Sequence, residues 1–377
     1  MRPVRALHIY SGNLFGGVER LLVTLAQYRH CCPALEAHVA LCFQGRLREE
    51  LQAAGVVPHV LGAVRTSQFW TVWRARRKLR EHLRAQGFDV AICHSPWAQA
   101  VFGPVVRRAH LPLVFWQHDV ATGQHWIERW AGMTPPDLAM SNSLFTAQSL
   151  GTVYPNAPID VLYCPVVIPK YRGCGSNRAS VRAELHTPPE ATVIIQVSRM
   201  EAWKGHALHL NALGMLRHLP NWLCWQVGGA QRPHEARYVE KLKRLAAQHG
   251  VADRVRFLGE RTDVARLMAA ADIYCQPNQR PEPFGIAFIE ALSVQLPVIT
   301  TAMGGALEIV DAACGILVPP DDAPALAKSL QRLMESPALR ARLGAAGPRR
   351  AHHLCDPEQQ MARLHTCLSR ISMKRRF

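Results

Sequence analysis

The stretch RPEPFGIAFIEALSVQLPVI, residues 280–299, contains two carboxylates, Glu282 and Glu290, with seven residues between them. Glu282 stands between two prolines, where a helix cannot run, whereas Glu290 lies within a helical pattern. Strand patterns flank the two acids at 272–277 and 297–301. The sequence therefore predicts a strand, a rigid loop, a helix and another strand, which is the repeating unit of an α/β sheet.

The same alternation of short apolar strands and helical segments continues in both directions along the chain. Continuous apolar strands between helices indicate parallel sheets that are covered on both faces. At 377 residues the chain is long enough for two such domains. We therefore predict an α/β fold with two doubly wound, Rossmann-like domains that face each other across a cleft. The expected strands are 4–10, 36–43, 58–62, 89–94, 112–118 and 137–141 in the first half, and 192–198, 222–229, 254–259, 272–277, 297–301 and 315–320 in the second.

A segment rich in proline, glycine and serine, residues 164–192, separates the two halves. We place an N-terminal domain at 1–170, a linker at 171–190 and a C-terminal domain at 191–355. A C-terminal helix with a basic tail, 356–377, can pack back on the N-terminal domain. Doubly wound sheets bind ligands at the carboxyl ends of their strands, so the residues that follow the strands are the candidate site residues.

The composition is that of a globular protein with an excess of positive charge. Forty-nine per cent of the residues are hydrophobic, and the formal net charge is +16, which predicts attraction to an anionic partner. The 11 cysteines form no CxxC pair, which is typical of reduced thiols in the cytoplasm. No apolar run reaches the length of a membrane span, so we expect a cytoplasmic protein.

The positive charge is densest in FWTVWRARRKLREHLRAQGF, residues 69–88, where six Arg and Lys residues accompany Trp70 and Trp73. The tail SMKRRF, residues 372–377, is also basic. A basic amphipathic helix with aromatic residues suits an anionic membrane surface, and no nucleic-acid recognition motif is present. Our hypothesis is that residues 69–88 bind the inner face of the membrane. A solvated helix face is the alternative.

Two cations follow the first strand of the second half. In QVSRMEAWKGHALHL, Arg199 and Lys204 come after the strand, and Gly205 precedes a helix. A diphosphate ligand needs fixed positive charges together with the amides of a helix N-terminus. Two solvated surface cations in a loop would produce the same pattern.

The acids of the opening stretch suit the sugars on either side of such a diphosphate. Glu290 can accept two vicinal hydroxyls, as on a ribose, and Glu282 can accept hydroxyls of a sugar beyond the phosphates. The amides of Phe284, Gly285 and Ile286 lie where a helix leaves its first N–H groups without intrahelical partners. Two unrelated, solvated glutamates are the alternative.

Two glycine pairs open helices after strands. Gly16 and Gly17, in YSGNLFGGVERLL, can face phosphates across the cleft, or can form a plain tight turn. They do not complete the GxGxxG fingerprint of dinucleotide sites. Gly304 and Gly305 allow a close approach of the backbone to a ligand, and Glu308 either serves that ligand or complements the helix dipole.

Histidines also end strands in the first half. His118 follows the strand 112–118 and can donate to a sugar hydroxyl or to another part of the substrate, although it is one of 18 histidines. Asp119 beside it is equally suited to cap a helix. His94 and Ser95 lie at the end of another strand, and we rank them below His118 as candidate site residues.

Taken together, these segments resemble the retaining GT-B glycosyltransferases of family 4, which include phosphatidylinositol mannosyltransferase and sucrose synthase. The resemblance rests on the E-x7-E pair within PEPFG, on SRMEAWKG, VRFLGE, ADIYCQPN and GGALEIV, and on the glycines at 16–17. It covers the whole chain and is strongest from about residue 190 to residue 320. The sequence departs from the family pattern at QPNQRPEP, where Pro-Ser is common.

The resemblance implies a metal-independent hexosyltransferase that retains the anomeric configuration and needs no cofactor. Its donor would be a nucleotide-diphosphate sugar, with UDP-sugars expected ahead of GDP-sugars, and its acceptor a saccharide or a lipid-linked molecule. The C-terminal domain would bind the donor and the N-terminal domain the acceptor. The implied contacts are Arg199, Lys204, Gly16 and Gly17 at the diphosphate, Glu290 at the ribose, Glu282, Phe284, Gly285 and Ile286 at the donor sugar, and His118 with Glu282 at the reaction centre.

We therefore predict a glycosyltransferase of cell-surface polysaccharide or glycolipid synthesis. Charge that builds on the departing diphosphate would be taken up by Arg199, Lys204 and the helix amides. Glu282 would bind hydroxyls rather than attack the sugar, because the leaving diphosphate can itself deprotonate the acceptor. Two alternatives remain open: a nucleotide-sugar-binding protein without transfer activity, and a GT-B nucleotide-sugar epimerase.

Overall fold

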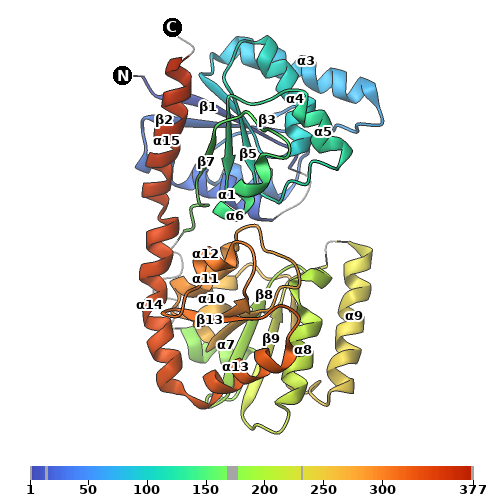
Figure 1. Cartoon of the computed structure of the whole chain (residues 1–377), viewed down its shortest axis with the longest axis vertical. Helices are drawn as coiled ribbons and strands as arrows, with labels where there is room; N and C mark the ends of the chain where they lie inside the picture. The colour runs from blue at the N-terminus through green and yellow to red at the C-terminus, as the bar shows by residue number, and fades with distance from the viewer. Residues whose placement is uncertain (1, 13–15, 168–176, 231, 375–377) are drawn as a thin grey trace. The chain divides into compact units, whose positions relative to one another are not determined.

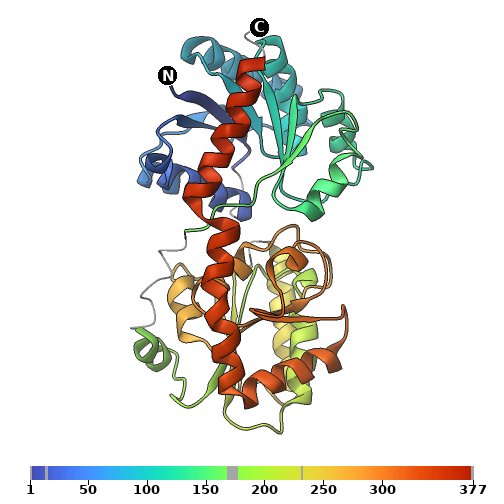
Figure 2. The same cartoon turned by 60° about the vertical axis from the view of Figure 1, so that its left-hand side comes forward.

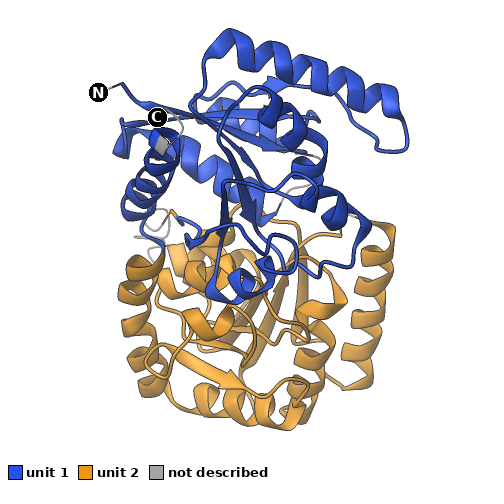
Figure 3. Ribbon diagram, turned by 45° about the horizontal axis from the view of Figure 1, so that its top comes forward, with its two compact units in different colours: residues 1–166, 355–377 blue, residues 167–354 orange. Residues whose placement is uncertain are grey.

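The computed structural model describes residues 2–12, 16–167, 177–230 and 232–374. The chain divides into two compact units, which Figure 3 colours separately: the first unit is residues 1–166 with 355–377, and the second unit is residues 167–354. The basic tail residues Arg375 and Arg376 lie outside the described residues.

The first unit is built on a seven-stranded parallel sheet in the order β3-β2-β1-β4-β5-β6-β7 (Figure 1). Every residue of β4 and β5 is buried, which explains why these strands read as continuous apolar runs. The strands are β1 (Val4–Tyr10), β2 (Leu35–Leu41), β3 (His59–Val60), β4 (Val90–Cys93), β5 (Leu113–Gln117), β6 (Leu138–Ser141) and β7 (Ile159–Val161). The helices are α1 (Gly17–Gln27), α2 (Arg46–Ala53), α3 (Phe69–Gln86), α4 (Pro96–Arg108), α5 (Trp126–Gly132), α6 (Leu144–Leu150) and α15 (Pro357–Lys374), with a 3-10 turn at Arg29–Cys31.

The second unit repeats this architecture with a six-stranded parallel sheet in the order β10-β9-β8-β11-β12-β13. Its strands are β8 (Thr192–Val197), β9 (Trp222–Val227), β10 (Val255–Gly259), β11 (Ile273–Gln276), β12 (Val298–Thr301) and β13 (Gly315–Val318). Its helices are α7 (Arg178–Glu184), α8 (His206–Met215), α9 (Pro233–Gln248), α10 (Val264–Ala270), α11 (Ile286–Ser293), α12 (Ala306–Ile309), α13 (Ala323–Glu335) and α14 (Pro337–Cys355), with a 3-10 turn η4 (Ala202–Lys204).

Part of the segment between the two halves is folded. Residues 178–184 form α7, which packs against α10 of the second unit. Both arginines of α7 pair with Asp272 just before β11, at 2.6 Å from Arg178 and 2.6 Å from Arg182. Asp272 also accepts a hydrogen bond from the backbone N–H of Val193 in β8, at 2.7 Å. This junction joins α7 to two neighbouring strands.

The last helix, α15, belongs to the first unit although it follows the second unit in the sequence. It packs against β1, β4 and α1, and Figures 1 and 2 both show it beside the strands of the first unit. Arg363 donates to the carbonyl of Val161 at 2.9 Å, and Arg370 pairs with Asp160 at 3.2 Å. The helix therefore covers part of the sheet formed by the start of the chain.

The predicted fold class is confirmed in each unit by these parallel, helix-covered sheets. All twelve expected strands are present, with ends that differ by at most two residues. The strand β7 was not predicted, because its three residues IDV contain an acid and form no apolar run. The cleft between the two domains stays a prediction.

Candidate functional site

The loop after β8 carries the two predicted cations of the second unit. It contains Arg199, passes through η4 and reaches Gly205, whose φ of 76° lies in the left-handed region. A Cβ atom at Gly205 would lie 1.7 Å from the carbonyl oxygen of Pro277. Glycine is therefore required here, and it brings the loop after β8 into direct contact with the loop after β11.

This contact joins two residues that the sequence predicted separately. The Nζ atom of Lys204 lies 2.6 Å from Oε2 of Glu282, and their side chains are only 13% and 12% exposed. Lys204 also lies over the ring of Trp203, 3.9 Å from its centroid. The second unit thus holds a nearly buried cation and a nearly buried carboxylate side by side at the carboxyl ends of β8 and β11.

Two side-chain amides at the end of β11 orient the same carboxylate. Oε2 of Glu282 also accepts hydrogen bonds from Asn278 at 3.0 Å and from Gln276 at 3.3 Å. The phenol of Tyr274 donates to Gln276 at 2.8 Å. Burial raises the pKa of Tyr274, and the negative charges of Glu282 and Glu290 raise it further. The phenol therefore stays protonated as a donor, and its electrostatic surroundings include both acids of the E-x7-E pair.

Tyr274, Gln276 and Asn278 were not predicted from the sequence as site residues. They stand at alternate positions at the end of a buried strand, and this spacing places them on one face of the sheet. The backbone carbonyls of Gln276 and Asn278 accept hydrogen bonds from Thr300 and Thr301 of β12, at 2.8 and 2.7 Å. Polar residues at every second position of such a strand end were the available signal.

The glycine pair after β12 has a structural role in this site. Gly305 donates its backbone N–H to the carbonyl of Glu282 at 2.8 Å, and Gly304 forms an isolated bridge with Glu282. A Cβ atom at Gly304 would lie 2.5 Å from that carbonyl oxygen. The close backbone approach of this glycine pair joins the loop after β12 to the loop that carries Glu282, and its approach to a ligand stays a prediction.

The remaining donor-site candidates lie on or before α11. Gly285 is its N-cap residue with a φ of 112°, and Ile286 is its first residue. Phe284 and Glu290 are buried, the acid one turn into the helix. The predicted helix start is confirmed.

Arg199 is linked to the Lys204–Glu282 pair through one acid. Glu201 accepts from the guanidinium of Arg199 at 3.0 Å and from the indole N–H of Trp203 at 2.9 Å. Trp203 in turn lies against Lys204. Arg199, Lys204 and Glu282 therefore belong to one continuous chain of side-chain contacts within the second unit.

The candidates of the first unit also lie at the carboxyl ends of strands. Gly16 is the N-cap residue of α1, and its N–H donates to Glu19 at 2.8 Å, while Tyr10 donates to the other oxygen of Glu19 at 2.9 Å. Gly17 is the first residue of α1. His118 directly follows β5, and burial lowers its pKa to about 3. The imidazole is therefore neutral at neutral pH.

Other candidates have structural partners. Ser95 caps α4 by accepting from the N–H of Ala98 at 3.1 Å. No helix begins directly after Asp119, which accepts instead from the N–H of Val120 at 2.8 Å. Glu308 lies in the first turn of α12, where a carboxylate complements the helix dipole.

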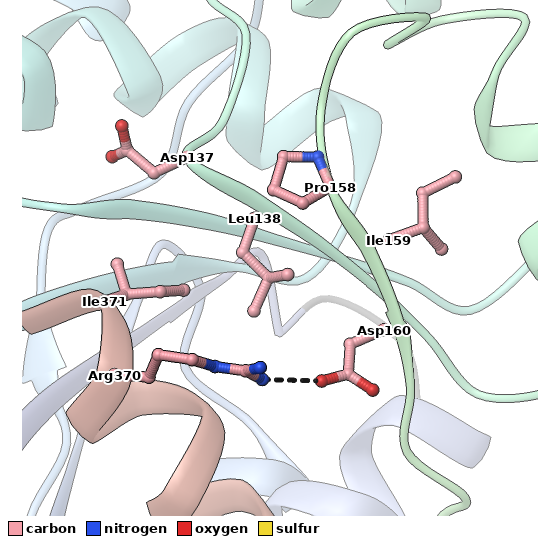
Figure 4. A pocket seen from close by; sticks show the side chains of 7 residues that line it. All are labelled: Asp137, Leu138, Pro158, Ile159, Asp160, Arg370 and Ile371. Carbon is pink, nitrogen blue, oxygen red and sulfur yellow. Dashed lines mark hydrogen bonds and ion pairs between the residues drawn. The ribbon is translucent and has the colours of Figure 1, made fainter. Parts of the chain in front are cut away.

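A pocket of about 300 Å³ lies elsewhere in the first unit (Figure 4). Arg370 and Asp160 pair across it, and it opens beside Asp137 and Pro158, which precede β6 and β7. It is therefore at the amino ends of these strands, the end opposite to that used by ligands of doubly wound sheets. None of the predicted site residues lines it.

The helix α3 exposes large aromatic side chains. Phe69, Trp70 and Trp73 are 78%, 51% and 63% exposed. Within the described residues, no helix is both long and apolar enough to cross a membrane. In the same part of the chain, no group of three or more His, Cys, Asp or Glu residues could hold a metal ion.

Known proteins resemble this chain over both halves. The family model for Glycosyl transferases group 1 matches residues 177–350, and the model for Glycosyltransferase Family 4 matches residues 15–168. The structure of Anabaena HepE in complex with UDP-glucose superimposes with a TM-score of 0.86 at 25% identity, over 97% of this chain and 99% of that chain.

Two relatives come from Rhizobium meliloti (strain 1021), and both are named lipopolysaccharide core biosynthesis glycosyltransferases. LpsD is 27% identical over 348 residues, which cover 91% of this chain and 92% of LpsD. LpsE is 29% identical over 182 residues, 48% of this chain, and the match spans about half of LpsE, 51%. With both halves matched by family models and the fold shared with HepE, the chain belongs to the GT-B glycosyltransferases of family 4.

Proposed function

We propose that this protein transfers a sugar, with retention of the anomeric configuration, from a nucleotide-diphosphate sugar to a saccharide or lipid-linked acceptor. The observation that carries the proposal is the 2.6 Å contact between Lys204 and Glu282. It sets a cation suited to a phosphate beside a carboxylate suited to sugar hydroxyls, at the strand ends where such sheets bind ligands. The names of LpsD and LpsE support a role in cell-surface polysaccharide or glycolipid synthesis.

In the proposed complex, Arg199 and Lys204 bind the donor diphosphate and Glu290 binds the ribose. Glu282 accepts hydroxyls of the transferred sugar, and its loop is already fixed by Gly305. Fixed cations need no rearrangement when charge develops on the leaving group, and one such group typically contributes about 3 kcal/mol to the transition state. The amides of Phe284, Gly285 and Ile286 add donors at the start of α11.

The first unit supplies Gly16, Gly17 and His118 in this proposal. His118 contacts the donor sugar near the reaction centre, and the glycines allow the backbone to come close to the phosphates. The departing diphosphate accepts the proton of the acceptor hydroxyl on the same face of the sugar, which retains the configuration. The positive charge needed at the leaving group comes from arginine and lysine, so we propose a metal-independent reaction.

We favour UDP as the nucleotide, with GDP as the second candidate. HepE was solved with UDP-glucose and provides the probe with which to begin. Transfer from UDP-glucose labelled in the sugar would be followed with and without an acceptor extract, in the presence of EDTA. Labelled product with the α configuration of the donor supports the proposal. Binding without turnover would favour the non-transferring alternative, and release of UDP with an isomerised sugar would favour an epimerase.

We further propose that the protein is cytoplasmic and binds the anionic inner face of the membrane through α3. Arg77 of α3 lies 5.9 Å from the ring centroid of exposed Trp73, so charge and aromatic surface occur together. Such a surface suits anionic lipid. The double variant Trp70→Ser/Trp73→Ser should lose sedimentation with phosphatidylglycerol vesicles. Met133→Ser, which changes an exposed side chain outside α3, is the control. Equal binding to phosphatidylcholine vesicles would refute the proposal.

A further inference from the structure

Three histidines of the first unit are hydrogen bonded ring to ring. Nδ1 of His8 lies 2.8 Å from Nε2 of His94, and Nδ1 of His94 lies 3.0 Å from Nε2 of His118. Trp116 stacks on the last two rings, with centroid distances of 5.3 and 5.5 Å. Only His118 has a place in the proposed function, so the other two rings need an explanation.

The strand pattern brings the rings together. His8 lies in β1, His94 follows β4 and His118 follows β5, and these three strands are neighbours in the sheet. Leu7 and Ile9 belong to the hydrophobic core on one face of the sheet, so His8 between them points to the other face. The rings therefore form a row across three adjacent strands.

All three rings are neutral. Burial lowers the pKa of His8 and of His118 to about 3, and lowers that of His94 well below its usual value. A neutral imidazole has one N–H donor and one acceptor nitrogen. His94 therefore donates in one of its two contacts and accepts in the other. The protons of the three rings consequently have only two possible arrangements.

The surroundings of His8, at one end of the row, decide which of the two proton arrangements is present. Nε2 of His8 is buried and has no hydrogen-bond partner among the described residues. If it carried the proton, a buried N–H would be left unpaired, which is rare in proteins. The proton of His8 is therefore on Nδ1 and is donated to His94, and His94 donates from its own Nδ1 to Nε2 of His118. His118 then carries its proton on Nδ1, the one ring nitrogen that the row leaves available.

We propose that His8 and His94 are positioning residues that hold His118 in the Nδ1–H tautomer, so that it presents a fixed hydrogen-bond donor to the substrate. The catalytic part of this inference rests on the proposed function, because it assumes that His118 contacts the donor sugar. The tautomer itself does not depend on that assumption.

The first test compares two replacements of His94 that are similar in size. His94→Asn keeps an N–H near the position of Nδ1, whereas His94→Leu removes it. With UDP-glucose, we expect His94→Leu to lower kcat about tenfold, as expected for the loss of one hydrogen bond to a buried group. His94→Asn should stay within about threefold of the unmodified protein, and the Kd for UDP should be unchanged in both. Equal losses in the two variants would overturn the proposal.

A double-variant comparison distinguishes positioning from general support of the fold. If His94 acts only through His118, His94→Leu should cause no further loss of kcat in a His118→Ala background. A full additional tenfold loss there would contradict the proposal.

The second test requires no substrate. Long-range ¹H–¹⁵N spectra of the full chain, labelled with ¹⁵N-histidine, report which nitrogen of each ring is protonated. The His118 signals, identified by their loss in His118→Ala, should be those of an Nδ1–H ring. An Nε2–H ring would overturn the inference. If the protein transfers no sugar at all, the proposed function fails, while these spectra still decide the tautomer.

Discussion

Replacing Lys204 by methionine should separate its role in folding from its role in transfer. The substitution leaves Glu282, only 12% exposed, without its cation. Stranding a buried charge usually costs 3–5 kcal/mol, but this carboxylate keeps two amide donors, Asn278 and Gln276. Because these two hydrogen bonds remain, the loss of stability should fall below that range, to about 1–2 kcal/mol, close to the contribution of a single hydrogen bond to a charged group. That corresponds to a decrease in Tm of roughly 2–8 °C for a unit of this size.

The same change removes a cation from the proposed diphosphate site, which should cost about 3 kcal/mol of transition-state stabilisation, or roughly 100-fold in kcat/KM. Thermal unfolding and initial rates with UDP-glucose measure the two effects. The variant Lys204→Met/Glu282→Gln removes both charges, so it should recover most of the lost Tm and none of the lost activity. If that double variant recovered activity, or if Lys204→Met retained kcat/KM within about threefold, Lys204 would not act on the diphosphate.

Three further outcomes follow from the contacts. Asp272→Ala leaves Arg182, 4% exposed, without its carboxylate, so urea unfolding should show a loss of about 3 kcal/mol, and a loss below 1 kcal/mol would refute the buried-pair argument. Gly205→Ala forces a Cβ atom against the carbonyl of Pro277 and should lower stability by at least about 1–2 kcal/mol. Gly250→Ala is the control, because Gly250 also has a positive φ but open space around its Cβ, so this variant should lose only the free energy of the left-handed backbone conformation. Equal losses of stability in the two variants would exclude a role for the contact with Pro277. The pKa of His8 and of His118 is lowered in the folded state, so the unfolded chain binds more protons between about pH 3 and 6.5. The contribution of these neutral rings to the stability of the first unit is therefore fully present above about pH 6.5, and the stability should fall as the pH decreases from 7 to 5. Unfolding that does not depend on pH over that range would contradict the burial of these rings.

The sequence predicted the sheets well because buried parallel strands are continuous apolar runs, which are visible without any knowledge of the fold. It also predicted which residues follow the strands, and Lys204 and Glu282 do meet. Their pairing was not predictable, because it depends on Gly205 bringing two loops together that are separated by 78 positions. The strand order of the sheet, which makes β8 and β11 neighbours, is equally invisible in a local pattern.

Gln276, Asn278 and His8 were not predicted, for a related reason. Gln276 and Asn278 look like ordinary polar residues at the end of a strand until the hydrogen bonds from their side chains to Glu282 are known. His8 was overlooked because a single histidine inside an apolar strand gives no indication of a partner. Its partners come from two other strands, so only the register of three neighbouring strands reveals the row of rings.

The position of α15 has a consequence for how the protein is made. The helix covers β1 and β4, yet the ribosome adds it only after all of residues 167–354. At usual rates of synthesis this interval lasts on the order of ten seconds or more, and during it the sheet of the first unit has an uncovered apolar surface. The second unit can therefore complete its fold before the first unit, and a chaperone that binds exposed apolar surface would find such a surface on the sheet of the first unit.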